Sequence, residues 1–86
     1  MATSDEFDNA IEQAKNLPVR PSSDVLLQLY ALYKQATGGD VQTARPGGFD
    51  FKNIAKWDAW KKQEGKSREA AQKEYVQLIN KLVANK

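Results

Sequence analysis

Residues 21–40 read PSSDVLLQLYALYKQATGGD, and this stretch predicts one complete helix with its start and its end. Pro21 to Asp24 bring short oxygen side chains to the place where the first N–H groups of a helix lack partners. Gly38 and Gly39 end the helix, because glycine adopts the left-handed C-cap conformation at little cost. The apolar residues between these signals cover more than one stripe: Val25, Leu26, Leu29, Tyr30, Leu32, Tyr33 and Ala36. We therefore expect either two packed faces, or one packed face and one ligand face.

A helix is also predicted before this stretch. It begins at Thr3 or Ser4, where Thr3 and Glu6 have the spacing of a capping box. Pro18 ends it, because proline lacks the N–H and its ring clashes with the preceding turn. Its apolar stripe consists of Phe7, Ala10, Ile11, Ala14 and Leu17.

Two more helices follow a long loop, residues 40–50. The third helix begins near Phe51 and ends at Gly65, and its large apolar residues include Ile54, Trp57 and Trp60. Ser67 caps the fourth helix. The fourth helix carries the longest stripe, made of Ala71, Tyr75, Leu78, Ile79, Leu82 and Val83.

Four amphipathic segments in a chain of 86 residues predict an all-α fold, a small helical bundle. No two-residue alternation of apolar side chains indicates strands. At this length we expect residues 1–86 to form a single domain with a small core. We expect one or both of Trp57 and Trp60 to anchor that core, because each can bury about 150–250 Å².

The composition limits the chemistry that is available. The chain has no Cys and no His, which argues against a disulfide framework, a thiolate nucleophile, an imidazole base or a His-ligated metal. Asp58 and Glu64 are too isolated in sequence to suggest an acid–base pair. The glycine pairs match no phosphate-cradling motif. We therefore expect a binding protein and not an enzyme, and we expect no catalytic or metal-ligating residue.

Charge is unevenly distributed along the chain. Residues 1–43 have three basic and six acidic side chains, a net of −3, whereas residues 44–86 have ten basic and five acidic, a net of +5. This asymmetry suggests an anionic partner for part of the surface. Residues 1–10 lack the pattern of a secretory signal, and no apolar run approaches the ~20 residues of a membrane span. We expect a cytoplasmic protein without stable membrane insertion.

Two groups of side chains have spacings that suit an anionic ligand. Tyr30, Tyr33 and Lys34 lie near one side of a helix, where phenols and an ammonium could hold a phosphate and the rings could stack on a purine. Lys52 and Lys56 repel each other at i, i+4 unless an anion lies between them. The alternative is that the tyrosines are core rings and the lysines are solvated. Lys61, Lys62, Lys66, Lys81 and Lys86 are assigned to solubility.

An ordered set of segments resembles the acyl-CoA-binding protein family. The segments are residues 30–37 (YALYKQAT), Gly39-Asp40, residues 45–47 (RPG) and residues 55–60 (AKWDAW), and the resemblance extends from Phe7 to Val83. The resemblance implies an up-down-down-up four-helix bundle whose long loop joins two parallel central helices. It also implies a long-chain fatty acyl-CoA ligand bound without chemical change, with no cofactor.

The resemblance also implies roles for individual residues of this chain. Tyr30, Lys34 and Lys56 would meet the 3′-phosphate of the CoA ribose, and Tyr33 would flank the adenine. The rest of the head-group surround would be Tyr75 and Lys15, with Lys52 as a supporting charge, and the acyl groove would be lined by Leu26 and Leu27.

The chain departs from the family pattern after Gly47, where larger aliphatic residues are commoner, and at Ala14, where a larger apolar residue is usual. From the resemblance we expect a monomeric acyl-CoA carrier that does not bind nucleic acid. The residues alone leave two alternatives open. One is a helical module for nucleic acid, and the other is a protein-interaction bundle whose aromatic residues all lie in the core.

Overall fold

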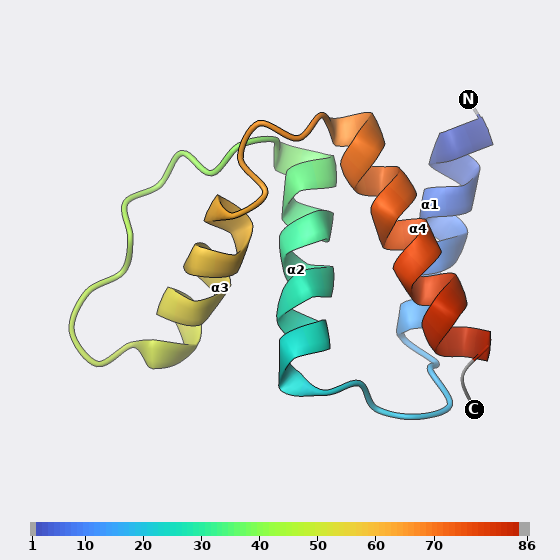
Figure 1. The fold of residues 1–86 in the computed structure, drawn as a ribbon, viewed down its shortest axis with the longest axis horizontal. Coiled ribbons are helices and arrows are strands. Elements are labelled where there is room, and N and C mark those ends of the chain that lie inside the picture. The colour runs from blue at the N-terminus through green and yellow to red at the C-terminus, as the bar shows by residue number, and fades with distance from the viewer. Residues whose placement is uncertain (1, 85–86) are drawn as a thin grey trace.

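The computed structural model describes residues 2–84, and side chains from residue 5 onward, and within this range the chain forms four α-helices and no strand. They are α1 (Ala2–Ala14), α2 (Ser23–Gly38), α3 (Phe51–Lys61) and α4 (Arg68–Ala84). Helices α2 and α3 run in the same direction, and α1 and α4 run in the opposite direction (Figure 1). The predicted up-down-down-up bundle is therefore confirmed.

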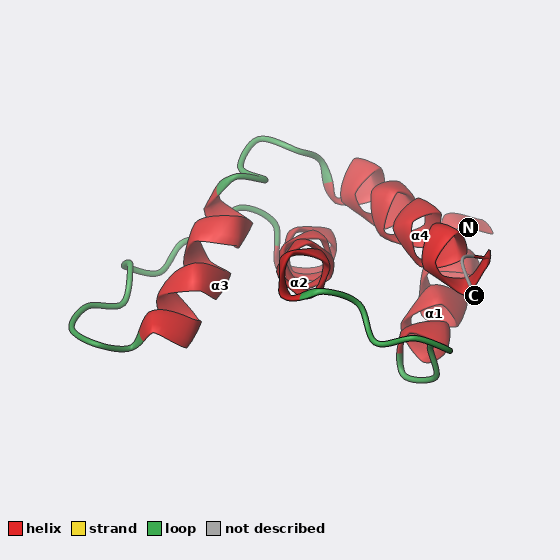
Figure 2. Ribbon diagram, turned by 60° about the horizontal axis from the view of Figure 1, so that its bottom comes forward, coloured by secondary structure: helices red, strands yellow, loops and turns green. Residues whose placement is uncertain are grey.

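The helices are arranged as an open row. Within residues 2–84 they form three packed pairs, which are α1 with α4, α4 with α2, and α2 with α3. Figure 2 shows α2 between α3 on one side and the pair of α4 and α1 on the other. The molecule is correspondingly flat, with extents of 38 × 29 × 15 Å.

The core lies between α1, α2 and α4. Its buried residues are Phe7, Ala10, Leu29, Leu32, Ala36, Ala71, Tyr75 and Ile79. Within Phe51–Lys61, by contrast, no residue is buried. Within residues 2–84, helix α3 therefore packs against α2 only. The bundle consists of a three-helix core of α1, α2 and α4, and of the less buried helix α3.

The helix boundaries agree with the local signals at α2 and α4. Ser22 Oγ accepts the Val25 N–H, and Ser67 Oγ accepts the Ala70 N–H at 3.1 Å. Gly39 has φ of 77° and donates its N–H to the Gln35 carbonyl, as expected for a helix end.

The other two helices differ from the prediction. Helix α1 begins at Ala2 and ends at Ala14, before the expected end at Pro18, and the predicted pair of Thr3 with Glu6 lies outside the described side chains. Lys15 and Asn16 continue as a turn with hydrogen bonds to the third residue back. Leu17 leaves the helix because a residue before proline disfavours the α conformation.

Helix α3 ends at Lys61 and not at Gly65. Residues 62–65 form a tighter turn, and Gly65 there has φ of 91°. The Gly65 N–H is donated at 2.9 Å to the carboxylate of Asp40, a residue on a different loop. A tertiary contact thus uses the N–H group that a longer helix would need. This hydrogen bond, together with a second from Gln35, lowers the pKa of Asp40.

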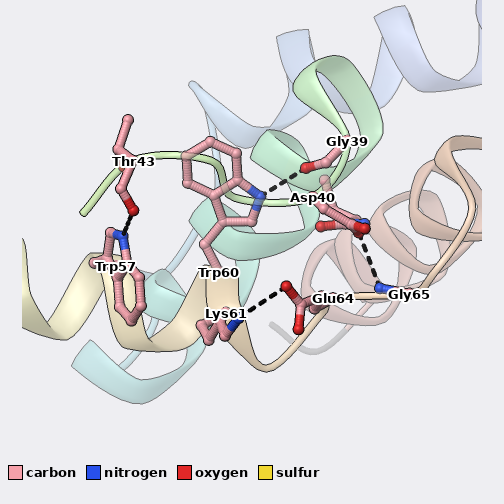
Figure 3. A network of polar contacts seen from close by, with 9 residues as sticks. Gly39, Asp40, Thr43, Trp57, Trp60, Lys61, Glu64 and Gly65 are labelled. Atoms are coloured by element: carbon pink, nitrogen blue, oxygen red, sulfur yellow. Dashed lines mark hydrogen bonds and ion pairs between the residues drawn. The ribbon is translucent and has the colours of Figure 1, made fainter. Parts of the chain in front are cut away.

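The expectation that a tryptophan anchors the core is wrong. Trp57 and Trp60 are half-buried and lie outside the core cluster. Each instead donates its indole N–H at 2.9 Å to a carbonyl of the long loop, Trp57 to Thr43 and Trp60 to Gly39 (Figure 3). The tryptophans therefore fasten the loop to α3.

An ion pair also attaches the long loop to α3. The Arg45 guanidinium donates to both oxygens of Asp58, at 2.9 and 3.0 Å. The pair lowers the pKa of Asp58. Asp58 thus has a structural partner, as does Glu64, which accepts from Lys61 at 2.8 Å.

The buried polar residue of the described chain is Gln35, which has no exposed surface. Its Nε2 donates to the Asp40 carboxylate and to the Lys66 carbonyl, both at 2.7 Å. Its Oε1 is buried and has no partner among the described residues. One side chain therefore joins α2 to the start of the long loop and to the loop that precedes α4.

We expect Gln35→Ala to lower the free energy of unfolding by about 2 kcal/mol. It removes one neutral and one charge-assisted hydrogen bond and leaves a cavity, partly offset by loss of the unpaired buried carbonyl. Urea unfolding followed by circular dichroism measures the difference. The matched control is Gln28→Ala, on the exposed face of the same helix, which should change stability by less than about 0.5 kcal/mol. Equal effects of the two variants would show that the Gln35 contacts contribute nothing specific.

Candidate ligand-binding site

A cavity of about 550 Å³ lies between the end of α1, the α1–α2 loop and the facing side of α2. Helix α4 packs against both helices, whose backbones are not in contact in the described part of the chain. Their facing sides and the loop between them enclose a hollow, with Tyr75 of α4 on its wall. The lining is mostly apolar and phenolic, with two cations: Ala14, Lys15, Leu17, Arg20, Pro21, Leu26, Leu29, Tyr30, Tyr33 and Tyr75. A space of this size is typical of small-molecule sites.

Three aromatic rings from three helices pack together, and two of them, Tyr33 and Tyr75, line the cavity. Phe7 packs edge-on against Tyr75, with ring centroids 5.3 Å apart, and stacks with Tyr33 at 6.2 Å. Tyr33 and Tyr75 lie 6.4 Å apart. Tyr75 is buried, whereas Tyr33 retains 39% of its exposure. The Tyr33 ring is therefore held from one side and open to a ligand from the other.

The pKa of the Tyr75 phenol is raised, chiefly by burial and further by the neighbouring phenol of Tyr33. The phenol is therefore protonated at neutral pH and can donate a hydrogen bond. The structure gives Tyr75 no hydrogen-bond partner from the side chains of residues 5–84. A core tyrosine that lines a cavity in this way has a free donor for a ligand.

Two cation–π pairs connect α2 to α3. Lys56 Nζ lies 5.3 Å from the centre of the Tyr30 ring, and Lys34 Nζ lies 5.0 Å from the centre of the Trp60 ring. The two pairs have matching spacing, since each partner on one helix is four residues from the other. Parallel helices keep such a register, and so Tyr30, Lys34 and Lys56 are brought to one interhelical face.

Neither ammonium group in these pairs forms an ion pair with a carboxylate among residues 5–84. A ring face offsets only part of a positive charge, about 0.5–1 kcal/mol at exposed sites. Lys34 and Lys56 are therefore positioned to accept an anion. Tyr30 lines the cavity and also lies under Lys56, so the cationic face continues into the hollow.

The other predicted site residues, Lys15, Lys52, Leu26 and Leu27, do not all lie at the cavity. Lys15 lines the cavity but is exposed and 3.5 Å from Glu12. Lys52 is exposed, one turn before Lys56. Leu26 lines the cavity, whereas Leu27 lies in a separate groove of about 390 Å³ between α2 and α3, beside Ala55 and Ala59. Two adjacent leucines thus serve opposite sides of α2.

Five lining residues were not foreseen as site residues from the sequence: Ala14, Leu17, Arg20, Pro21 and Leu29. Leu17, Arg20 and Pro21 reach the cavity because α1 ends early and its loop folds along the hollow. Leu29 was foreseen only as part of the α2 stripe. The one available signal was Arg20, a cation in a short loop between two prolines, which no helix periodicity could have placed.

The arrangement suits a ligand with an anionic end and an apolar end. Unpaired lysines and phenols can hold phosphate through charge-assisted hydrogen bonds. Tyr33 can stack on a flat ring, and leucines can cover a hydrocarbon segment.

Comparisons with known proteins agree with this geometry. A family model described as Acyl CoA binding protein matches residues 4–79. The Acyl-CoA-binding protein homolog of Drosophila melanogaster is 57% identical over 81 residues, covering 94% of this chain and 94% of the relative. The Acyl-CoA-binding protein of Saccharomyces cerevisiae is 49% identical over 78 residues, covering 91% and 90%.

Solved structures show the same fold. The crystal structure of Oryza sativa Acyl-CoA-Binding Protein 2 has a TM-score of 0.92 and 47% sequence identity, and covers 96% of this chain and 92% of that chain. The crystal structure of the protein from Moniliophthora perniciosa has a TM-score of 0.90 and 42% identity, covering 95% and 81%. The chain therefore belongs to the acyl-CoA-binding protein family.

Proposed function

We propose that this protein binds long-chain fatty acyl-CoA esters non-covalently and serves as an intracellular carrier and pool former for them. One observation carries the proposal. A cavity with apolar and phenolic walls continues, through Tyr30, into a face with two lysines that lack carboxylate partners. An acyl-CoA has the matching halves, a phosphorylated nucleotide and a hydrocarbon tail. The names of the relatives support the assignment.

In this proposal the nucleotide is held by charge and by stacking. Lys34 and Lys56 neutralise the 3′-phosphate, and Tyr30 donates its phenol to it. Tyr33 offers its open ring face to the adenine. Supporting contacts come from the phenol of Tyr75, the ammonium of Lys15 and the more distant charge of Lys52. Arg20 adds a second cation at the cavity wall.

In this proposal the acyl tail lies along the leucines of the cavity, Leu17, Leu26 and Leu29. Leu27 stays a predicted acyl-groove residue, in the neighbouring groove between α2 and α3. Each buried methylene contributes about 0.8 kcal/mol. Several methylenes together therefore outweigh any single polar contact. Withdrawal of the tail from water keeps the ester out of micelles and makes it deliverable to other proteins.

We further propose that residues 1–86 act as one monomeric binding domain in the cytoplasm, and that the ligand leaves chemically unchanged. The family is one of binding proteins, which supports a carrier over an enzyme. The basic residues of the second half of the chain act, in this view, on the CoA phosphates and not on a nucleic acid.

Calorimetric titration tests the proposal. Palmitoyl-CoA should bind tightly, free CoA and palmitate much more weakly because each offers only one half of the contacts, and an oligonucleotide should not bind. When the complex is incubated with a thiol reagent, the reagent should detect no free CoA that increases in proportion to the protein concentration. Preferred binding of the oligonucleotide with a steep salt dependence would support a nucleic-acid module instead. No response to any of these ligands would support a protein-interaction bundle.

Lys34→Ala and Lys56→Ala should each weaken palmitoyl-CoA binding by about 1.5–3 kcal/mol, because each removes a charge-assisted contact to a doubly charged phosphate. The double variant should be non-additive, since both side chains share one anion. Titration of palmitoyl-dephospho-CoA, which lacks the 3′-phosphate, should show little effect of either variant.

The matched control for the lysine variants is Lys81→Ala, at an exposed position of α4, which should leave both affinities unchanged. Equal weakening toward both ligands would mean that Lys34 and Lys56 provide only a general field. If neither variant weakens either ligand, both lysines are solvated side chains without a binding role.

Tyr75→Phe should keep the melting temperature and weaken palmitoyl-CoA binding by about 0.5–1.5 kcal/mol, the contribution of one hydrogen bond. The substitution keeps the ring that packs on Phe7 and removes only the hydroxyl. Thermal unfolding and titration of the same preparation measure both quantities. Unchanged affinity with a lowered melting temperature would mean that Tyr75 serves the core alone.

A further inference from the structure

The most exposed large apolar side chains of the described chain lie next to one another. Phe49 is 90% exposed and Phe51 is 69% exposed, and their rings meet edge-on with centroids 6.1 Å apart. They are at the end of the long loop and the first residue of α3. Neither ring lines the cavity described above. Water-exposed aromatic pairs of this kind mark interaction sites.

The segment that carries this pair is positively charged. Residues 41–62, which comprise most of the long loop and α3, have five basic and two acidic side chains, a net of +3. One of the two carboxylates, Asp58, is already paired with Arg45, and the other, Asp50, accepts from Asn53 at 2.9 Å. Lys52 directly follows the second ring and is exposed. An exposed lysine therefore adjoins the apolar tip, within a segment of net positive charge.

The tip lies at a particular end of the molecule. The start of α3 is at the same end as the α1–α2 loop and the start of α2 (Figure 1). That loop exposes Val19 at 59% and contributes Leu17, Arg20 and Pro21 to the cavity. The tip and this part of the cavity lining are therefore at the same end of the molecule.

We propose that the Phe49–Phe51 pair docks this protein on anionic lipid surfaces. The two rings enter the interfacial region of the bilayer, and Lys52, which directly follows the second ring, contacts the acidic head groups. The docking is peripheral, since no helix in residues 2–84 is long and apolar enough to cross a membrane. That docked protein exchanges acyl-CoA with the bilayer rests on the proposed function, whereas docking itself does not.

A lipid surface fits the patch better than a second copy of the chain does. Two rings per copy bury about 150–250 Å² each, which falls short of the ~1,200–2,000 Å² of a stable interface. Two copies would also bring like charges together. A bilayer needs no complementary shape, and its anionic head groups match the sign of the segment.

The test uses ligand-free protein and sedimentation with vesicles that contain no acyl-CoA. Binding should be clear on phosphatidylcholine vesicles with about one third phosphatidylserine, weaker on phosphatidylcholine alone, and reduced by added salt. The double variant Phe49→Ser/Phe51→Ser should bind the anionic vesicles about tenfold more weakly. The matched control, Phe49→Leu/Phe51→Leu, keeps the apolar tip and should retain most of the binding.

Two further measurements separate the outcomes. In lipid-free solution the serine variant should bind palmitoyl-CoA like the parent protein, and both should be monomeric by sedimentation. Equal vesicle binding by the parent and the serine variant would overturn the proposal. So would loss of palmitoyl-CoA affinity with vesicle binding intact, or a dimer that the serine variant abolishes. If the parent protein binds vesicles but not palmitoyl-CoA, the carrier function fails and docking stands.

Discussion

The buried amide of Gln35 joins the three segments that decide the topology. Its two hydrogens go to Asp40, at the start of the long loop, and to the Lys66 carbonyl, just before α4. Asp40 in turn accepts from Gly65. The end of α2, the departure of the long loop and the entry to α4 are thereby held at one point. With these ends joined, the long loop must return along α3, and α3 must run parallel to α2.

Parallel α2 and α3 have a direct consequence for the site. Two helices in the same direction keep equal spacings in register, so Tyr30 meets Lys56 while Lys34 meets Trp60 one turn later. An antiparallel pair would bring together only one of these two contacts. The cationic face is thus a product of the topology, and the loop contacts of Trp57 and Trp60 hold α3 in the position that it requires.

The open row of helices explains why a small protein has a cavity at all. A closed bundle of this size would fill its interior with side chains, but here, within residues 2–84, α4 packs against both α1 and α2 while the backbones of α1 and α2 are not in contact. The space that remains receives Tyr75 from the core and Leu17 and Arg20 from the α1–α2 loop. Core packing and cavity lining therefore share residues, and Tyr75 belongs to both.

The sequence by itself determined the local structure. Ser22 and Ser67 begin helices, Gly39 ends one, and the wide apolar pattern of α2 indicated a second face beyond the packed one, which the cavity accounts for. These features depend on neighbours within a few residues, which periodicity and capping rules describe. Only the tertiary structure decided what depends on distant residues. The roles of Gln35, Trp57 and Trp60, the early end of α3 and the separation of Leu26 from Leu27 all depend on partners on other elements. A pattern read along one helix carries no information about such partners.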